Sequence, residues 1–308
     1  VLGAAIVDII MKIPRLPKSG EDILCTERKL TIGGCAYNVS NILRSFNVKH
    51  DLFVPVGCGI YADIIRRELN EDGYEILIND LEMDNGYCLC LVEENGERSF
   101  ITVNGIEANH KWFHNLNMNQ YENIYLAGYQ LCGDKSDIVV DWLLNQSDKN
   151  IFFAPGPVIN NISKNTLEKI FSINPILHLN EKEALEFTKK DNINHSILRL
   201  YELTKNVVFI TLGERGVIFY NGKNITHIEG EKVKVVDTIG AGDSHIGTII
   251  SVYSLWADKM NFNYSWSNYL NENNDFIKGC KLANKIASEV VQVQGSKISK
   301  ECFNKSNI

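Results

Sequence analysis

The sequence predicts an α/β protein built around a largely parallel sheet. Short apolar runs that suit buried strands alternate with segments whose apolar residues recur at helical spacing. Such alternation favours a parallel sheet with helices on both faces. The chain has 308 residues, 44% of them hydrophobic and 22% charged, which is enough for a large core in a globular protein. It contains no internal repeat and no linker that would divide it.

The N-terminal elements are expected to be a strand, an extended segment and a helix. Residues 1–7 form a buried-strand candidate, which places Asp8 at the carboxyl end of the strand, where ligands bind in open α/β sheets. Residues 21–32 have an extended pattern and end at a double glycine. A helix should follow, with an apolar face at Ala36, Val39, Ile42, Leu43 and Phe46. Asn38 then falls in the first turn of this helix.

Residues 87–103 have the pattern of a β-hairpin. Two runs of strand-forming residues, 87–92 and 98–103, are separated by a turn that contains Asn95-Gly96. Asn-Gly is a strong hairpin signal, because both residues readily take up the positive φ angles of a type I′ turn. We therefore expect two antiparallel strands here.

The rest of the chain continues as strand-plus-helix units. Strands are expected near residues 123–126, 151–154, 176–179 and 207–212, and a last helix near 276–291. Residues 256–275 are rich in asparagine with interspersed aromatic residues, and we expect an irregular surface excursion there.

One short stretch points to chemistry. Residues 237–243 read Asp-Thr-Ile-Gly-Ala-Gly-Asp, and apolar residues at helical spacing follow. The small residues leave backbone N–H groups bare, and the following helix adds the positive end of its dipole, which suits a phosphoryl group. Asp243 at the same place could take a proton from an attacking hydroxyl. Taken alone, the stretch also fits a tight turn with an aspartate cap.

Two motifs resemble the signatures of the ribokinase-like (PfkB) carbohydrate kinases. The stretch 237–243 resembles the second signature, and Gly33-Gly34-Cys35-Ala36-Tyr37-Asn38 resembles the first. The resemblance covers essentially the whole chain and implies one kinase domain, residues 1–308. It implies a ribokinase-like three-layer sandwich with a central, mostly parallel sheet. A small β-lid over the sugar site maps to about residues 10–33 and 86–105, and the expected hairpin falls in the second of these segments.

The resemblance also implies a set of site residues. The implied catalytic residues are Asp243, as the general base, and Gly240, Ala241 and Gly242, which offer backbone N–H groups to the transferring phosphoryl. The implied substrate-binding residues are Asp8, Gly34 and Asn38. Without the resemblance, Asp8 also suits a strand-end turn and Asn38 the first turn of a helix.

A second group of residues is implied on the nucleotide side. The implied nucleotide-binding residues are Asn180, Thr211, Gly213, Gly216 and Asn284. Asn180 and Glu183 resemble an Asn-x-x-Glu element that helps to place Mg²⁺ through water. The same pair before a helical run is also a capping pair, and the two interpretations are compatible. In several relatives the segment around Asp237 holds a monovalent cation such as K⁺, so this residue is a candidate for that role.

The chain departs from the family pattern in two places. Ribokinase itself has a lysine directly after the double glycine, whereas this chain has Cys35, which puts ribose in doubt as the substrate. Ala154 stands where the family usually has aspartate, which puts one phosphate or metal contact in doubt. His245 follows the base into the helix, and we expect it to be packed or hydrogen-bonded locally rather than catalytic.

Composition excludes several other classes. The net charge of −7 and the lack of a Lys/Arg cluster argue against a nucleic-acid surface, and no apolar run has the length of a membrane helix. The eight cysteines are scattered without metal-binding spacing, which favours reduced thiols and a cytoplasmic location.

The expected function is therefore the ATP-dependent, Mg²⁺-requiring phosphorylation of a hydroxyl, best a primary one, of a sugar or sugar-like metabolite. A nucleoside kinase of the same fold and a catalytically silent sugar- or nucleotide-binding regulator remain as alternatives, and the intact Asp243 with its glycines disfavours the regulator. A nicotinamide-dependent oxidoreductase is disfavoured because residues 3–8 lack Gly-x-Gly-x-x-Gly, and no P-loop motif occurs. Exposed lid strands would allow a homodimer.

Overall fold

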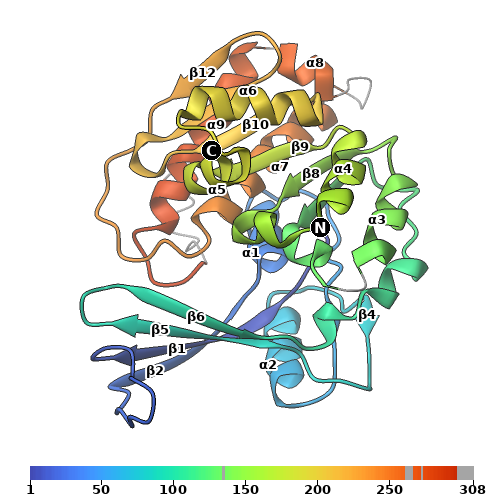
Figure 1. The fold of residues 1–308 in the computed structure, drawn as a ribbon. Coiled ribbons are helices and arrows are strands. Elements are labelled where there is room, and N and C mark those ends of the chain that lie inside the picture. The colour runs from blue at the N-terminus through green and yellow to red at the C-terminus, as the bar shows by residue number, and fades with distance from the viewer. Residues whose placement is uncertain (134–135, 261–265, 272, 297–308) are drawn as a thin grey trace.

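The computed structural model of the chain describes residues 1–133, 136–260, 266–271 and 273–296 (Figure 1). Within these residues, the largest sheet has six strands in the order β12-β11-β10-β9-β8-β7. Their bounds are β7 Asn123–Ala127, β8 Asn150–Ala154, β9 Ile176–Asn180, β10 Val208–Thr211, β11 Val217–Tyr220 and β12 Ile225–Ile228. Strands β7 to β10 pair in parallel, and β11 and β12 pair antiparallel at one edge. The expected central, mostly parallel sheet is confirmed.

Helices cover both faces of this sheet. One face carries α3 Ser136–Leu144, α4 Lys164–Ser172, α5 Glu181–Thr188 and α6 Ile193–Thr204; the other carries α1 Cys35–Ser45, α7 Ala241–Lys259, α8 Trp266–Asn271 and α9 Asn273–Val290. Neighbouring strand residues point to opposite faces, so Leu126 packs with the first group and Tyr125 with the second. This alternation gives each face its own core, which confirms the three-layer arrangement that the resemblance implies.

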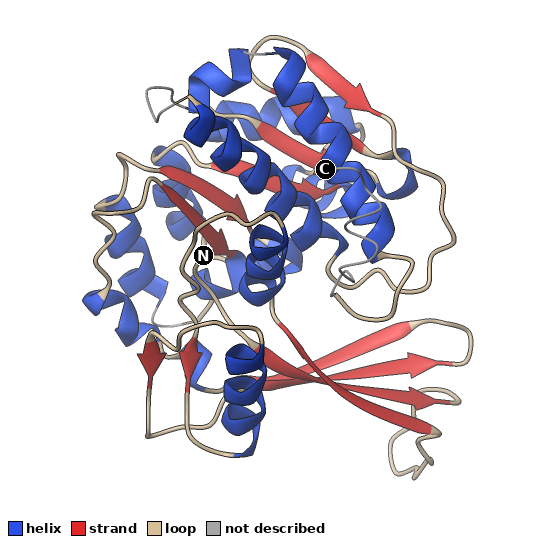
Figure 2. Cartoon of the chain, turned by 180° about the vertical axis from the view of Figure 1, so that it is seen from behind, coloured by secondary structure: helices blue, strands red, loops and turns tan. Residues whose placement is uncertain are grey.

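A second, four-stranded sheet extends away from these layers, as Figures 1 and 2 show from opposite sides. Its order is β2-β1-β5-β6, with bounds β1 Ile6–Ile13, β2 Glu27–Gly33, β5 Tyr87–Glu93 and β6 Arg98–Val103. The expected hairpin is confirmed: β5 and β6 pair antiparallel, and Gly96 in the turn has a φ of 88°. We call this unit the projecting sheet.

Smaller elements lie at the base of the projecting sheet and in the connections. They are α2 Ile60–Glu71, β3 Pro55–Val56, β4 Ile78–Asn79, and the 3₁₀ turns η1 Ile106–Ala108, η2 His110–Asn115, η3 Gly128–Leu131, η4 Gly156–Asn161 and η5 Gly213–Arg215. The strands β3 and β4 pair in parallel, and α2 packs on β1. No helix in the described ranges combines the length and the apolar character needed to cross a bilayer.

The expectation for the first strand was wrong. The strand begins at Ile6 rather than Val1, and Asp8 is its third residue rather than its last. The cause is tertiary pairing, because β1 runs on to Ile13 between β2 and β5. Near the start of the chain, Leu2 makes only isolated bridges, to Phe53 and Leu126.

The expectation of an irregular surface excursion at 256–275 was also wrong for its described part. The helix α7 continues to Lys259, and α8 begins at Trp266. Trp266 and Tyr269 are buried, and the Trp266 ring lies 4.8 Å from that of Tyr253, centroid to centroid. These aromatic side chains reach a core that sequence spacing did not reveal. Residues 261–265 and 272, part of the same expectation, lie outside the described residues.

Candidate active site

The loop 237–243 ends as expected in a helix N-terminus. The helix α7 begins at Ala241, after Gly240, whose φ of 78° lies in the left-handed region that glycine adopts readily. Within the described residues, no hydrogen bond is made by the backbone N–H groups of Gly242 and Asp243, and no side chain caps the helix. A Cβ atom added at Gly242 would meet no heavy atom within 4 Å. This end of α7 is therefore open and electropositive, as an anion site requires.

Asp243 is half-buried at this helix end. Asn38 Nδ2 donates a hydrogen bond to its Oδ2 at 2.8 Å, and the Oδ1 of Asn38 accepts one from Ser296 at 2.6 Å. Burial raises the pKa of Asp243 to about 6, while hydrogen bonds from Asn38 and Cys35 oppose the rise. Asp243 is thus ionised for most of the time near neutral pH, yet it is basic enough to accept a proton.

Two glycines allow Asp8 and α1 to approach each other. A Cβ atom on Gly33 would lie 2.0 Å from Asp8 Oδ2, and one on Gly34 would lie 2.4 Å from the Ala4 carbonyl oxygen. Gly34 has a φ of 103° and directly precedes α1. Burial, with the charge of Asp237 as a smaller cause, raises the pKa of Asp8 to about 7. The structure therefore brings the first signature close to the loop 237–243.

Asp237, at the other end of the loop, is fully engaged. It forms an ion pair with Arg98 of β6, its Oδ1 accepts from the Ile239 N–H at 2.8 Å, and its Oδ2 accepts from the Gly295 N–H at 3.0 Å. Sequence reasoning missed Arg98. The strand period places Arg98 only relative to other residues of β6; its position on the same face as Asp8 follows from the pairing of β1, β5 and β6.

A cavity of about 260 Å³ lies where the projecting sheet meets this loop. The sheet contributes Ile10, Cys90 and Arg98, and the loop contributes Asp237 and Ile239. A space of this kind between a sheet and a loop is suitable for a small polar ligand.

The pair Asn180 and Glu183 forms the capping box that the sequence predicts for α5. Asn180 Oδ1 accepts from the Glu183 N–H at 2.8 Å, and Glu183 Oε2 accepts from the Asn180 N–H at 3.0 Å. Burial raises the pKa of Glu183, and the nearby charge of Asp243 adds to the shift. The capping role is confirmed, and the pair also lies within electrostatic range of Asp243.

The sequence and the fold can now be compared with those of known proteins. Residues 1–301 match the family described as pfkB family carbohydrate kinase. The chain is a pfkB family carbohydrate kinase.

Individual relatives of this kinase are also described as sugar kinases or ribokinases. It is 32% identical to the uncharacterized sugar kinase YegV of Escherichia coli, over 82% of this chain and 80% of that protein. It is 27% identical to a ribokinase of Dictyostelium discoideum, over 100% of this chain and 97% of that protein. A solved ribokinase from Thermotoga maritima superposes with a TM-score of 0.80 at 20% identity, over 99% of this chain and 97% of that chain. Such a likeness at low identity shows the ribokinase-like fold.

Other residues of the kinase have firm structural roles. Thr211 ends β10, Gly213 begins η5 and Gly216 follows it, with φ of 63° and 86° at the two glycines. Asn284 is buried, and its Nδ2 donates to the carbonyl oxygens of Ile228 and Glu229, at 3.0 Å each. These two hydrogen bonds use the Nδ2 donor of Asn284 to hold the end of β12. The contact between Asn284 and adenine stays a prediction.

His245 is packed locally, as expected. Its Nδ1 lies 3.0 Å from Nε2 of His178, and burial lowers its pKa to about 4. Of the two departures from the family pattern, Cys35 begins α1 beside Asp243, and Ala154 ends β8, half-buried against the core.

Kinases of this family use ATP with Mg²⁺, and the donor set here suits that ion. The described residues contain no cluster of three or more His, Cys, Asp or Glu side chains that could hold a metal alone. Glu183 and Asp243 nevertheless supply carboxylate oxygens in one electrostatic neighbourhood, where burial raises both pKa values. Burial disfavours the charged form of both carboxylates, and a divalent cation that keeps most of its waters would offset that free-energy cost. The residues therefore fit Mg²⁺.

Proposed function

We propose that this kinase transfers the γ-phosphoryl group of ATP to a hydroxyl, best a primary hydroxyl, of a sugar or sugar-like metabolite, with Asp243 as the general base. The observation that carries the proposal is the position of Asp243, whose half-buried carboxylate has a pKa near 6 beside the bare N–H groups of α7. A base with this pKa is mostly deprotonated at neutral pH.

In this mechanism the carboxylate of Asp243 accepts the proton of the substrate hydroxyl as its oxygen attacks the γ-phosphorus. The new O–P bond forms, the bond from the γ-phosphorus to the bridging oxygen breaks, and ADP leaves. Asn38 orients the carboxylate through its hydrogen bond of 2.8 Å. The N–H groups of Gly240 and Gly242 stabilise the negative charge of the transferring phosphoryl, and so does that of Ala241 once it gives up its 3.3 Å hydrogen bond to the Thr238 carbonyl oxygen.

We assign the other residues to binding. Asp8, Gly34 and Asn38 hold the sugar hydroxyls, and Asn180, Thr211, Gly213, Gly216 and Asn284 bind the nucleotide. Glu183 would hold Mg²⁺ through water, and the ion would neutralise charge on the phosphates. Backbone oxygens near Asp237 hold K⁺ if a monovalent cation is used, because the Asp237 carboxylate is committed to Arg98.

The projecting sheet acts in this proposal as a lid, with segments at residues 10–33 and 86–105. It excludes water that would compete with the sugar hydroxyl for the phosphoryl group. The ion pair between Arg98 on β6 and Asp237 supports this role, because it joins the lid to the loop that carries the base.

The lid also supports a homodimer. Leu30, Ile101 and Val103 lie on one face of the projecting sheet and are 42%, 52% and 40% exposed. Exposed apolar side chains on an open sheet are a common pairing surface. Sedimentation velocity should show a dimer that Ile101→Lys weakens, and a monomer at all concentrations would contradict it.

We further propose a cytoplasmic location. Seven cysteines in the described part of the chain are free, which suits a reducing compartment. Cys302 lies outside the described residues.

The experiment for the function is ADP release from Mg·ATP with a panel of pentoses, hexoses, keto-sugar acids and nucleosides, with phosphorus NMR of the product. Turnover with one sugar and a phosphate ester at its primary carbon supports the proposal. Turnover with nucleosides alone would support the nucleoside kinase. ATP binding without turnover on any acceptor would support the silent regulator.

A further inference from the structure

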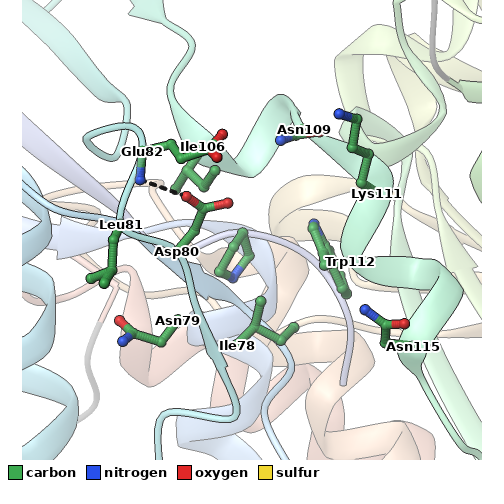
Figure 3. Close-up of a pocket in the computed structure, with 11 residues that line it drawn as sticks. Ile78, Asn79, Asp80, Leu81, Glu82, Ile106, Asn109, Lys111, Trp112 and Asn115 are labelled. Atoms are coloured by element: carbon green, nitrogen blue, oxygen red, sulfur yellow. Dashed lines mark hydrogen bonds between the residues drawn. The ribbon is translucent and has the colours of Figure 1, made fainter.

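A second cavity, of about 510 Å³, lies at the base of the projecting sheet (Figure 3). Its walls come from residues 78–82, which include β4, and from residues in the range 106–115, which includes η1 and η2, together with Pro55. None of these residues belongs to the proposed kinase site. The volume falls within the range of pockets that bind small metabolites.

The charges in this cavity are divided between its two sides. Asp80 and Glu82 lie on one side and Lys111 on the other, as Figure 3 shows. Lys111 forms no ion pair with any described residue, and neither do the two acidic side chains. The Oδ1 of Asp80 accepts a hydrogen bond from the Glu82 N–H at 2.8 Å, which fixes the acidic side. Two acidic side chains therefore face one lysine across the space, and none of the three is ion-paired with a described residue.

The wall between these charges is apolar and contains buried polar atoms without partners. Trp112 is 9% exposed, and within the described residues neither its indole N–H nor the Oδ1 of Asn109 has a hydrogen-bond partner. Ile78 and Ile106 add apolar side chains to the lining of the cavity. Buried polar atoms without partners are uncommon in folded proteins, and a ligand or ordered water usually satisfies them.

We propose that this cavity binds a free amino acid. Its ammonium group would pair with Asp80 and Glu82, its carboxylate with Lys111, and its side chain would lie on Trp112. A neutral sugar would leave all three charges unpaired. A nucleotide would bring its phosphates close to two carboxylates, which repel them.

The position of the cavity gives this ligand a route to the projecting sheet. Residues 80–86 lead into β5, and residues 104–106 leave β6. These two connections are bonded to each other and to the cavity wall: the Ile106 N–H donates to the Asp84 carbonyl oxygen at 2.9 Å, and Asn85 Nδ2 donates to the Pro55 carbonyl oxygen at 2.9 Å. An amino acid bound between Asp80 and Lys111 would hold both connections in place, and so slow hydrogen exchange in them.

The test is isothermal titration calorimetry of the full chain with each of the common amino acids. Two further sets serve as probes: the corresponding amines without a carboxylate, and the corresponding acids without an amine. No ATP or sugar is present, so the result does not depend on the kinase proposal. We expect one amino acid to bind with one-to-one stoichiometry, and Lys111→Met and Glu82→Gln each to weaken its binding at least about tenfold, since each removes a charged partner. Hydrogen exchange should slow at residues 83–86 and 104–107 when this ligand is added.

Matched controls come from α4. Lys164→Met and Glu168→Gln remove the same charges from exposed positions, with the Lys164 side chain 91% exposed, and should leave binding unchanged. The proposal is overturned if no amino acid binds in the millimolar range. It is equally overturned if the two cavity variants bind as the wild type does, or if the amine without a carboxylate binds as tightly as the amino acid.

Discussion

Asp237 and Asp243 stand at the two ends of one short loop, yet their surroundings differ. Asp237 is 3% exposed, is paired with Arg98, and accepts two backbone hydrogen bonds. Asp243 is half-buried, receives a side-chain hydrogen bond from Asn38, and has a pKa raised to about 6. One carboxylate is saturated with partners, and the other keeps acceptor capacity beside an open helix end.

The difference indicates that the same residue type serves structure at one end and chemistry at the other. A carboxylate that accepts hydrogen bonds from the backbone and pairs with an arginine fixes a loop. A carboxylate that burial has made more basic, beside bare N–H donors, is arranged for proton transfer. Substitutions at the two positions should therefore fail in different assays.

The largest effect is expected for Asp243→Asn. The variant keeps the size and hydrogen-bonding shape of the side chain but loses its basicity, so kcat should fall about 10²–10⁴-fold. ATP affinity and the melting temperature should change little. Steady-state ADP release, together with calorimetry of ATP binding, measures this. A variant with wild-type kcat would remove Asp243 from its proposed role.

A smaller effect, on stability rather than chemistry, is expected for Asp237→Asn. It leaves Arg98, whose side chain is 22% exposed, without a charged partner, and should lower the free energy of unfolding by about 2 kcal/mol. Urea unfolding measures this change. Asp258→Asn, on an exposed position of α7, is the control and should leave the unfolding midpoint in place. An unchanged midpoint in Asp237→Asn would show that the ion pair contributes nothing.

The smallest effect is expected for Asn180→Ala, which tests whether Asn180 binds nucleotide in addition to capping α5. Asn180→Ala should cost about 1 kcal/mol of stability, because it removes an N-cap acceptor. Asn192→Ala removes the comparable cap of α6, where Asn192 Oδ1 accepts from the Asn194 N–H at 2.7 Å. Both should lose similar stability in urea unfolding, and only Asn180→Ala should raise the KM for Mg·ATP. Equal KM values would restrict Asn180 to the capping role.

Short-range sequence patterns predicted much of the fold and part of the candidate site. The hairpin depended on Asn95-Gly96, the start of α7 on Gly240, and the cap of α5 on Asn180 with Glu183, all of which are short-range patterns. The sequence predicted these correctly because each signal acts within a few residues.

Long-range pairing was not predictable in the same way. Arg98 and Asp237 are 139 residues apart, and no spacing rule connects them. Asp8 was expected at the end of a strand because the run of residues 1–7 is apolar, but pairing with two neighbours moved the strand toward Ile13. Trp266 is buried against Tyr253 and Phe152, which lie outside the local sequence pattern. Residues 256–275 were therefore expected to be an irregular surface segment.

The most direct test of the central claim is the pH dependence of single-turnover phosphoryl transfer at saturating sugar and Mg·ATP. The pKa of Asp243 is raised to about 6, so the base is lost as pH falls through that value. The rate should rise from about pH 5, level off above about pH 7, and show no such rise in Asp243→Asn. A wild-type rate that is flat from about pH 5 to about pH 8, or a rise of the same size in the variant, would contradict Asp243 as the base.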